Sequence, residues 1–252
     1  MDFTNQVVLI TGASRGIGKA TAIEFANRNA TVVINYRNNE AAANETLAAL
    51  PGKGHSIFRA DVCEPEALNS MIEATVERYG KLDVVVNNAG CSVNHAIEKV
   101  EFEEWQAAWR KVIDTNLIGA ANVAFFAAKQ MMQQKHGRMV FVSSRGAFRG
   151  EPTKPAYGAS KAGMNALSQS LAKQLAPYNI FIGTVAPGFV ATDMGVQTLS
   201  KTEKEAIERE CPLKRVAKPE EVAYSIAFLA SKGAEFSTGA ILDVNGASYL
   251  RT

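Results

Sequence analysis

The sequence predicts an α/β fold, a doubly wound parallel sheet with helices on both faces. Three observations lead to this class: apolar runs typical of strands buried on both faces, helical patterns between them, and strict alternation of the two. The strands are expected at residues 7–10, 32–34, 84–86, 139–142, 181–185 and 241–244, with 55–60 as a further strand. The helices are expected at roughly residues 16–28, 38–49, 65–79, 102–135, 157–176 and 219–231.

Length and composition favour a single domain. A chain of 252 residues with 47% hydrophobic content can bury a large core. No Pro/Ser-rich run, charge block or internal repeat divides the sequence, so one domain over residues 1–252 is expected. Because ligands of doubly wound sheets bind at the carboxyl ends of the strands, the functional site is expected there.

Charge and cysteine content bear on partners and compartment. The net charge of +2 argues against nucleic acid, because binding there needs a concentrated basic footprint. The apolar stretch at residues 7–10 is too short for a signal peptide or a membrane span, so a cytoplasmic protein without a membrane partner is expected. The three cysteines and three histidines lack the spacing of a disulfide, redox or zinc motif, so no metal site is expected.

One stretch of the chain carries an excess of positive charge. Between Lys129 and Lys161 the only acidic residue is Glu151. The basic residues within the stretch are Lys135, Arg138, Arg145, Arg149 and Lys154. The pattern fits either an ordinary solvated face or a surface that attracts an acidic substrate or carrier protein.

A glycine-rich segment, T-G-A-S-R-G-I-G at residues 11–18, follows the first expected strand and opens the first expected helix. Gly12, Gly16 and Gly18 would let the backbone approach a nucleotide pyrophosphate, and the helix N-terminus would offer oriented N–H groups. The spacing is G-x-x-x-G-x-G and not G-x-G-x-x-G, so an ordinary tight turn is the alternative interpretation.

A tyrosine and a lysine four residues apart, Tyr157 and Lys161 in Y-G-A-S-K, would share one face of a helix. Because an ammonium group favours the phenolate, Lys161 is expected to lower the pKa of Tyr157 and make it a usable general acid–base. The hydroxyl of Ser144 would add a second hydrogen-bond donor to a substrate oxygen that gains negative charge. This trio suits carbonyl reduction; the alternative is a surface pair and a strand end without chemistry.

Taken in chain order, these motifs resemble those of the short-chain dehydrogenase/reductase family along the whole chain. The resemblance rests on the glycine-rich turn, N-N-A-G at residues 87–90, Asn116, Ser144, Y-x-x-x-K, and P-G at residues 187–188. It implies a single-domain Rossmann-type sheet of about seven strands. It further implies that residues 1–120 mainly bind the cofactor and that residues 121–252 mainly supply catalytic and substrate-lid elements.

The resemblance assigns roles to the matching positions. Tyr157 would protonate a carbonyl oxygen, Lys161 would hold the nicotinamide ribose and Ser144 would orient the carbonyl, while Asn116 would fix a water in the proton relay. The expected catalytic residues are Asn116, Ser144, Tyr157 and Lys161. The expected cofactor-binding residues are Gly12, Ser14, Arg15, Gly16, Ile17, Gly18, Tyr36, Arg37, Asp61, Val62, Asn88, Ala89, Gly90, Tyr157, Lys161, Pro187, Gly188, Val190 and Thr192.

The end of the second strand predicts the choice of cofactor. NAD enzymes place a carboxylate there, roughly 20 residues past the glycines, to accept from the ribose 2′-hydroxyl. This chain has Tyr36 at that position, followed by Arg37, and Arg15 lies within the glycine turn. Two guanidinium groups could bind a 2′-phosphate, so NADP(H) is the expected cofactor. The alternative is that both arginines point into solvent.

Within the family, the segments V-I-N-Y-R, H-G-R-M-V-F-V-S-S and V-A-P-G-F-V-A-T-D-M are most similar to reductases of 3-oxoacyl groups on acyl carrier protein. This implies NADPH-dependent reduction of a 3-oxoacyl thioester in fatty-acid biosynthesis, with Lys135 at one carrier-docking position. The second such position holds Tyr178, and the segment between Gly90 and Trp109 is about four residues longer than is usual in the family. Two alternatives are a broad carbonyl reductase or alcohol dehydrogenase and, more remotely, a non-catalytic cofactor-sensing protein.

Assembly and substrate access are inferred partly from pattern and partly from the resemblance. Residues 117–132 are apolar on nearly every face and small residues crowd 159–175, which indicates burial beyond the sheet. The resemblance implies a homotetramer built on these helices and the last strand; burial under the sheet alone is the alternative. Residues 189–211, with a helix-like polar run at 200–210, would form the substrate lid.

Overall fold

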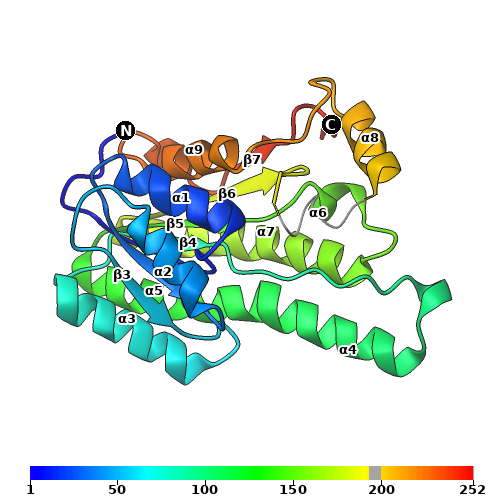
Figure 1. The fold of residues 1–252 in the computed structure, drawn as a ribbon. Helices are drawn as coiled ribbons and strands as arrows, with labels where there is room; N and C mark the ends of the chain where they lie inside the picture. The colour runs from blue at the N-terminus through cyan, green and yellow to red at the C-terminus, as the bar shows by residue number, and fades with distance from the viewer. Residues whose placement is uncertain (193–199, 252) are drawn as a thin grey trace.

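The computed structural model describes residues 1–192 and 200–251, and a seven-stranded parallel sheet forms its centre (Figure 1). The strand order is β3-β2-β1-β4-β5-β6-β7, so the chain changes direction across the sheet between β1 and β4. Ligands of such sheets bind at this switch point. The strands are β1 (Val7–Ile10), β2 (Thr31–Tyr36), β3 (Ser56–Arg59), β4 (Val84–Asn87), β5 (Gly137–Val142), β6 (Ile180–Pro187) and β7 (Ile241–Val244).

Helices cover both faces of the sheet, as the predicted doubly wound class requires (Figure 1). The helices are α1 (Gly16–Ala26), α2 (Glu40–Ala48), α3 (Pro65–Tyr79), α4 (Phe102–Ile113), α5 (Gly119–Gln134), α6 (Gly146–Arg149), α7 (Pro155–Leu175), α8 (Lys201–Glu210) and α9 (Pro219–Ala230). Short turns of helix lie at η1 (Ile97–Lys99), η2 (Asp114–Ile118), η3 (Ala176–Tyr178) and η5 (Glu235–Ser237). The fold class predicted from the sequence is confirmed.

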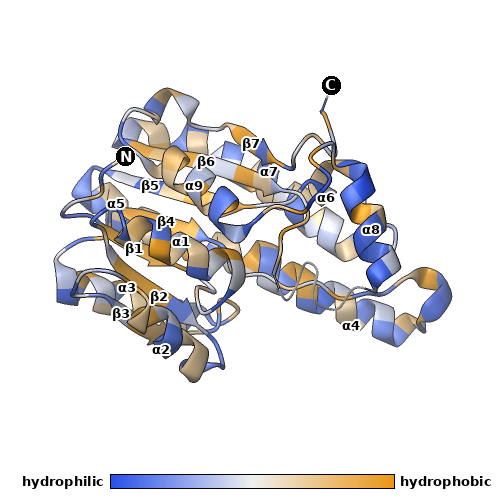
Figure 2. Ribbon diagram, turned by 45° about the horizontal axis from the view of Figure 1, so that its top comes forward, coloured by the Kyte–Doolittle hydropathy of each residue, from blue (hydrophilic) through white to orange (hydrophobic). Residues whose placement is uncertain are grey.

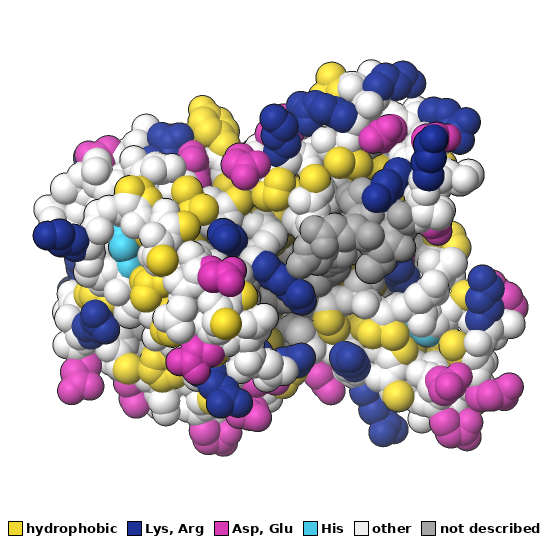
Figure 3. Space-filling view, viewed as in Figure 1, with side chains coloured by type: hydrophobic (Ala, Val, Ile, Leu, Met, Phe, Trp, Pro, Cys, Tyr) yellow, Lys and Arg dark blue, Asp and Glu magenta, His cyan; other side chains and the backbone are white. Residues whose placement is uncertain are grey.

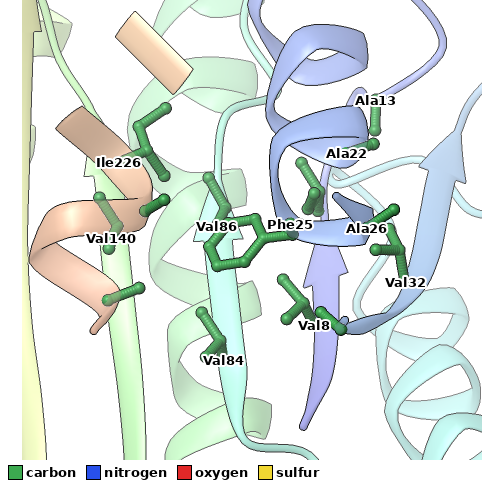
Figure 4. Close-up of a cluster of buried hydrophobic side chains, with 14 of the residues drawn as sticks. Val8, Ala13, Ala22, Phe25, Ala26, Val32, Val84, Val86, Val140 and Ile226 are labelled. Carbon is green, nitrogen blue, oxygen red and sulfur yellow. The ribbon is translucent and has the colours of Figure 1, made fainter. Parts of the chain in front are cut away.

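Two hydrophobic clusters, one on each face, hold the helices to the sheet. On one face Phe25 of α1 lies against Val86 of β4, and Ile226 of α9 lies beside Val140 of β5 (Figure 4). On the other face, buried side chains of α3, α5 and α7 pack against the alternate residues of the same strands. Because successive side chains of a strand point to opposite faces, β1 serves both clusters and anchors the centre of the core.

The elements and their burial follow the apolar patterns, with three differences. β7 and β3 are only partly buried, because they are the edge strands and lack a neighbour on one side. The single helix expected over residues 102–135 is interrupted by the π-helical turn η2, which separates α4 from α5. The sequence pattern also gave no indication of α6, whose four residues are too few for helical periodicity.

The polar helix expected at residues 200–210 is present as α8, which is mainly hydrophilic in Figure 2 while the central strands are mainly hydrophobic. Ser200 caps it, accepting from the N–H of Glu203, whose carboxylate accepts from the N–H of Ser200 in return. Such a capping box begins a helix without requiring a buried face. The remainder of the expected lid between α8 and β6, residues 193–199, lies outside the described residues.

Candidate active site

The glycine-rich turn lies at the switch point, between β1 and α1. Gly12 and Gly16 have φ angles of +62° and +56°, the left-handed region that L side chains rarely adopt. A Cβ built on Gly12 would lie 3.0 Å from the Cα of Ala89, and one built on Gly18 would lie 2.5 Å from the carbonyl oxygen of Gly12. The backbone is thus bare where the N-terminus of α1 begins, which fits a bound pyrophosphate.

The N-N-A-G segment is fastened to this turn through the side chain of Thr11. The Thr11 hydroxyl accepts from the backbone N–H groups of Asn88 and Ala89, both at 3.0 Å. The Asn88 amide donates to the carbonyl oxygens of Thr11 and Gly12, at 2.9 and 3.1 Å. These bonds join the ends of β1 and β4 into one wall of the cleft.

A buried asparagine in the second strand holds the same turn from the other side. The side-chain oxygen of Asn35 accepts from the N–H of Gly12 at 3.2 Å, and its amide donates to the carbonyl oxygen of Ala60 at 3.0 Å. Neither Asn35 nor Thr11 was expected from the sequence as a supporting residue. The signal for Asn35 was available, since it is a polar residue within an apolar strand and such a residue is buried only when hydrogen-bonded.

Asn116 lies in η2 and is fully buried beneath the segment that follows β4. Its side-chain oxygen accepts from the N–H of Cys91 at 2.7 Å, and its amide donates to the carbonyl oxygen of Cys91 at 2.9 Å. The amide also donates to the hydroxyl of Ser160 at 3.0 Å, which links it to α7. The π-helical turn η2 thus places Asn116 between the segment after β4 and α7. π-helical turns are frequent at functional sites.

Tyr157 and Lys161 lie one turn apart on α7, and the structure brings Ser144 and Asn116 to the same place. Ser144 lies close enough to Tyr157 for its hydroxyl to lower the pKa of the tyrosine, and its Oγ accepts from the N–H of Gly146 at 3.0 Å. The Lys161 ammonium lies 5.9 Å from the centre of the Tyr157 ring and donates to the carbonyl oxygen of Val142 at 2.7 Å. A Cβ built on Gly90 would lie 3.2 Å from the Asn116 side-chain oxygen and 3.7 Å from the Lys161 nitrogen, so all four expected catalytic residues border one space.

The expected direction of the Tyr157 pKa is wrong for this structure. Burial raises the pKa of the Tyr157 hydroxyl above its usual value; the nearby Ser144 hydroxyl lowers this pKa in part, and the charge of Glu151 raises it further. The Lys161 ammonium does not counter this rise, because it faces the tyrosine ring and donates to Val142. Tyr157 is therefore a phenol at neutral pH, ready to act as an acid.

Burial lowers the pKa of Lys161 from 10.5 to about 8, because the ammonium is 4% exposed and burial penalises its charged form. The group is still mostly protonated at neutral pH. The carbonyl of Val142 accepts from the Lys161 ammonium, and the hydroxyl of Ser143 donates to the backbone carbonyl of Lys161 at 3.2 Å.

The expected adenine end of the cofactor site lies at the ends of β2 and β3. Tyr36 is buried. It therefore does not present a polar group to solvent where an NAD enzyme would present its carboxylate. Arg37 is 54% exposed, and its guanidinium lies 3.5 Å from the carboxylate of Asp61. Arg15 is the exposed residue that precedes the first turn of α1. Val62 lies beside Asp61 and packs where a Cβ on Gly119 would fall, 2.8 Å away.

The remaining expected cofactor residues lie as the motifs indicate. Ile17 packs on the core from α1, and the carbonyl of Ser14 accepts from the hydroxyl of Thr46 at 3.1 Å. Pro187 ends β6, and the N–H of the next residue, Gly188, donates to the carbonyl of Val244 at 3.0 Å. Val190 is buried and pairs with Ala217, and Thr192 lies 3.2 Å from a Cβ position on Gly16. The loop after β6 thus closes over the glycine turn.

Internal ion pairs neutralise part of the basic stretch. Arg145 is 4% exposed and donates to the Glu210 carboxylate of α8 at 2.8 Å, as does the partly exposed Arg149 at 3.0 Å. Burial raises the pKa of Glu210, but the hydrogen bond from Arg145 and the two positive charges outweigh it and lower the pKa overall. Arg138 pairs with Glu235. In Figure 3 basic and acidic side chains are interspersed over the visible face.

Lys135, the expected carrier-docking residue, lies at the opposite edge of the sheet from Ser144. It follows α5 and precedes β5, whereas Ser144 lies just beyond the carboxyl end of that strand. At about 3.3 Å per residue, the six residues of β5 separate the two edges by roughly 20 Å. Within one subunit, Lys135 therefore does not border the catalytic residues.

No helix within residues 1–192 and 200–251 is long and apolar enough to cross a membrane. The same part of the chain holds no group of three or more His, Cys, Asp or Glu side chains that could bind a metal ion.

The chain is similar to known proteins over nearly its whole length. Residues 12–247 match a family model described as enoyl-(acyl carrier protein) reductase. The chain is 37% identical over 246 residues to 3-oxoacyl-[acyl-carrier-protein] reductase of Synechocystis sp., with 96% of each chain covered. It is 38% identical over 249 residues to 3-oxoacyl-[acyl-carrier-protein] reductase FabG of Thermotoga maritima, with 98% of each covered. The FabG of Staphylococcus aureus is 36% identical over 244 residues, with 96% of this chain and 97% of the relative covered.

The chain belongs to the short-chain dehydrogenase/reductase family, as its motifs indicated. It is an oxidoreductase that interconverts a CH–OH group and a C=O group with a nicotinamide cofactor. The bare glycine turn fits such a cofactor, because side chains at Gly12 and Gly18 would meet neighbouring backbone where the pyrophosphate would bind.

The buried Lys161 predicts a specific dependence of stability on pH. Between its folded pKa of about 8 and its unfolded value of about 10.4, the unfolded chain binds more protons, so this group makes stability rise with pH. Relative to Lys161→Met, the wild-type free energy of unfolding should gain about 2 kcal/mol between pH 7.5 and pH 9.5. Urea unfolding of both proteins at one protein concentration measures this. A pH-independent difference would contradict the buried, shifted ammonium.

Proposed function

We propose that this protein reduces the 3-oxo group of an acyl thioester, carried on acyl carrier protein, to a 3-hydroxyacyl group with NADPH, as in fatty-acid biosynthesis. The observation that carries the proposal is the grouping of Ser144 and Tyr157 beside Lys161 and Asn116. The relatives named 3-oxoacyl-[acyl-carrier-protein] reductase match this chain over nearly its full length, which supports the substrate class.

The mechanism follows from the two hydroxyl groups. When bound, the nicotinamide supplies a hydride for the carbonyl carbon. Negative charge then develops on the carbonyl oxygen, where Ser144 and Tyr157 would both donate hydrogen bonds. The raised pKa keeps the proton on Tyr157 until that oxygen becomes basic enough to take it. Asn116 holds the segment around Cys91 through two hydrogen bonds and would orient the water that reprotonates Tyr157.

NADPH is the preferred cofactor in this proposal because the end of β2 offers an arginine instead of a carboxylate. Arg37 is half-exposed, and its 3.5 Å contact with Asp61 is long enough to be exchanged for a phosphate. The Nε of Arg59 donates to the carbonyl of Arg37 at 3.1 Å, which adds a second positive charge near Arg37. One acidic residue, Glu40, also lies nearby; it stands at the start of α2 and beside Tyr36.

The proposed assembly is a homotetramer of single-domain subunits in the cytoplasm. The first 120 residues would bind mainly the cofactor, and the rest would supply the catalytic and lid elements. Ile118 and Phe125, at the start and middle of the α5 region, are 47% and 60% exposed. Such side chains favour a helix face covered by another subunit. The three cysteines are unpaired, which suits a reducing compartment.

A second candidate is a broad carbonyl reductase or alcohol dehydrogenase that acts on small ketones or 3-oxo esters without a carrier. The position of Lys135 at the far edge of the sheet favours it, as does the exposed Tyr178 in place of a second basic residue. A cofactor-sensing protein without chemistry is the weakest candidate, because the structure brings Asn116, Ser144, Tyr157 and Lys161 together.

Replacing Tyr157 by Phe should reduce turnover of a short 3-oxoacyl thioester at least a hundredfold, because the proton donor is lost, while NADPH still binds. Oxidation of NADPH followed at 340 nm measures turnover, and quenching of protein fluorescence measures binding. A 2-enoyl thioester serves as the comparison substrate, because the matched family model is described as an enoyl reductase. Full activity of Tyr157→Phe would remove the tyrosine from the mechanism, and faster enoyl reduction would overturn the substrate proposal.

Arg37→Ala should raise the KM for NADPH roughly tenfold to a hundredfold and leave the KM for NADH unchanged. The reason is that each charge-assisted hydrogen bond to a phosphate contributes about 1.5 to 3 kcal/mol. The matched control is Arg78→Ala on α3, whose guanidinium stacks on Tyr79 at 5.2 Å instead. Equal effects of Arg37→Ala on both cofactors, or a wild-type enzyme that prefers NADH, would show that this arginine does not read the 2′-phosphate.

The carrier requirement separates the two candidate functions. If the carrier docks, kcat/KM for a 3-oxoacyl group on acyl carrier protein should exceed that for the same group on a short thioester fragment by at least tenfold. Lys135→Glu should then remove most of that preference and leave turnover of the fragment unchanged. Similar efficiencies for the two substrates would favour the broad carbonyl reductase.

A further inference from the structure

We infer that His95 is a positioning residue for Tyr157, acting through the first turn of α7; this inference rests on the proposed role of Tyr157. His95 lies in the longer segment between Gly90 and Trp109. It is 1% exposed and therefore cannot touch a substrate in the cleft. Two of its hydrogen bonds lead to the loop before α7 and to the start of that helix.

Two hydrogen bonds join His95 to the residues just before Tyr157. The backbone N–H of His95 donates to the carbonyl of Thr153 at 2.9 Å. The ring nitrogen Nε2 of His95 accepts from the backbone N–H of Ala156 at 3.2 Å, within a buried environment. Ala156 immediately precedes Tyr157, so the acceptor lies one residue from the proposed proton donor.

The second bond meets a need of the helix. The first backbone N–H groups of an α-helix have no partner within the helix, and a side-chain acceptor usually comes from the capping residue. Lys154, which precedes α7, supplies no such side-chain bond, and Pro155 has no N–H. His95 thus supplies from another segment the acceptor that the local sequence lacks.

The partners of His95 also fix its protonation. A backbone N–H can only donate, so Nε2 must carry the lone pair. Its other nitrogen, Nδ1, lies 2.9 Å from the carbonyl of Val93, which can only accept, so Nδ1 carries the proton. The imidazole is therefore neutral, and both of its nitrogens are committed.

Aromatic side chains of α4 hold the imidazole in place. Trp105 and Trp109 meet the ring of His95 edge-on, each with ring centres 6.5 Å apart. The two tryptophans also contact each other, with centres 5.2 Å apart. A ring packed on its edges cannot rotate away from Ala156, so the hydrogen bond has a fixed direction.

The test compares two substitutions of similar size. Gln places its side-chain oxygen about as far along the chain as Nε2 of histidine, whereas Met has similar length but no strong acceptor. His95→Met should lower kcat for the 3-oxoacyl thioester roughly tenfold to a hundredfold, since small misplacements of a catalytic group have effects of that size. The KM for NADPH should change less than about twofold, and His95→Gln should restore most of kcat.

Trp109→Phe is the matched control, because it disturbs the same packing and leaves the acceptor of Ala156 intact. An equal loss of kcat in Trp109→Phe and His95→Met would reduce His95 to a packing residue and overturn the inference. Equal losses in His95→Met and His95→Gln would do the same.

In a Tyr157→Phe background, His95→Met should cause little further loss, because a positioning residue acts only through the group it positions. Additive losses would contradict this.

Amide hydrogen exchange over residues 153–160 keeps this inference separate from the proposed function. Faster exchange there in His95→Met than in His95→Gln is expected whatever the substrate is. If the wild-type protein reduces no 3-oxoacyl thioester, the proposed function fails, and the exchange result still reports whether His95 holds the start of α7. Unchanged exchange in His95→Met would overturn the inference directly.

Discussion

The buried ammonium of Lys161 is the group on which the arrangement of the site depends. Lys161 is 4% exposed, and a buried charge needs polar partners. The carbonyl of Val142, at the end of β5, accepts from the ammonium, and Gly90 has no side chain that would crowd it. Burial lowers its pKa to about 8, so the site retains a positive charge at neutral pH at some cost in stability. The fold compensates elsewhere, through two dry clusters on the faces of the sheet.

The parallel sheet decides why these groups meet. All seven strands run in one direction, so their carboxyl ends, and the loops that follow them, lie at one edge. Thr11 fastens the loop after β1 to the loop after β4, while Asn116 fastens that second loop to α7 through Ser160. Four segments far apart in the chain thereby become a single rigid wall. Tyr157 lies on α7, which is held in place by these hydrogen bonds. Its raised pKa suits the proposed role as an acid in reduction.

Much of the fold and of the site followed from local pattern. The strands at residues 7–10 and 241–244 have the limits that the apolar runs indicate, and the glycine turn lies between β1 and α1 as its context requires. What the pattern missed depends on contacts between distant segments. Asn35 supports Gly12 across the sheet, Ser160 receives the Asn116 amide, and His95 reaches Ala156 from another loop. No periodicity encodes such pairs, because each partner is chosen by its position in space.

The sequence by itself determined the alternation of strands and helices and the glycine turn, because these depend on residue type and short-range spacing, while the four residues proposed as catalytic followed from the family resemblance. Only the tertiary structure decided their electrostatics. Spacing alone indicated that Lys161 would lower the pKa of Tyr157. In the structure burial raises the pKa of Tyr157, and the Lys161 ammonium donates to Val142. Likewise, Arg145 and Arg149 counted as surface charge in the sequence, yet they pair with Glu210 of α8. A pKa or an ion pair depends on burial and three-dimensional distance, which the order of residues does not specify.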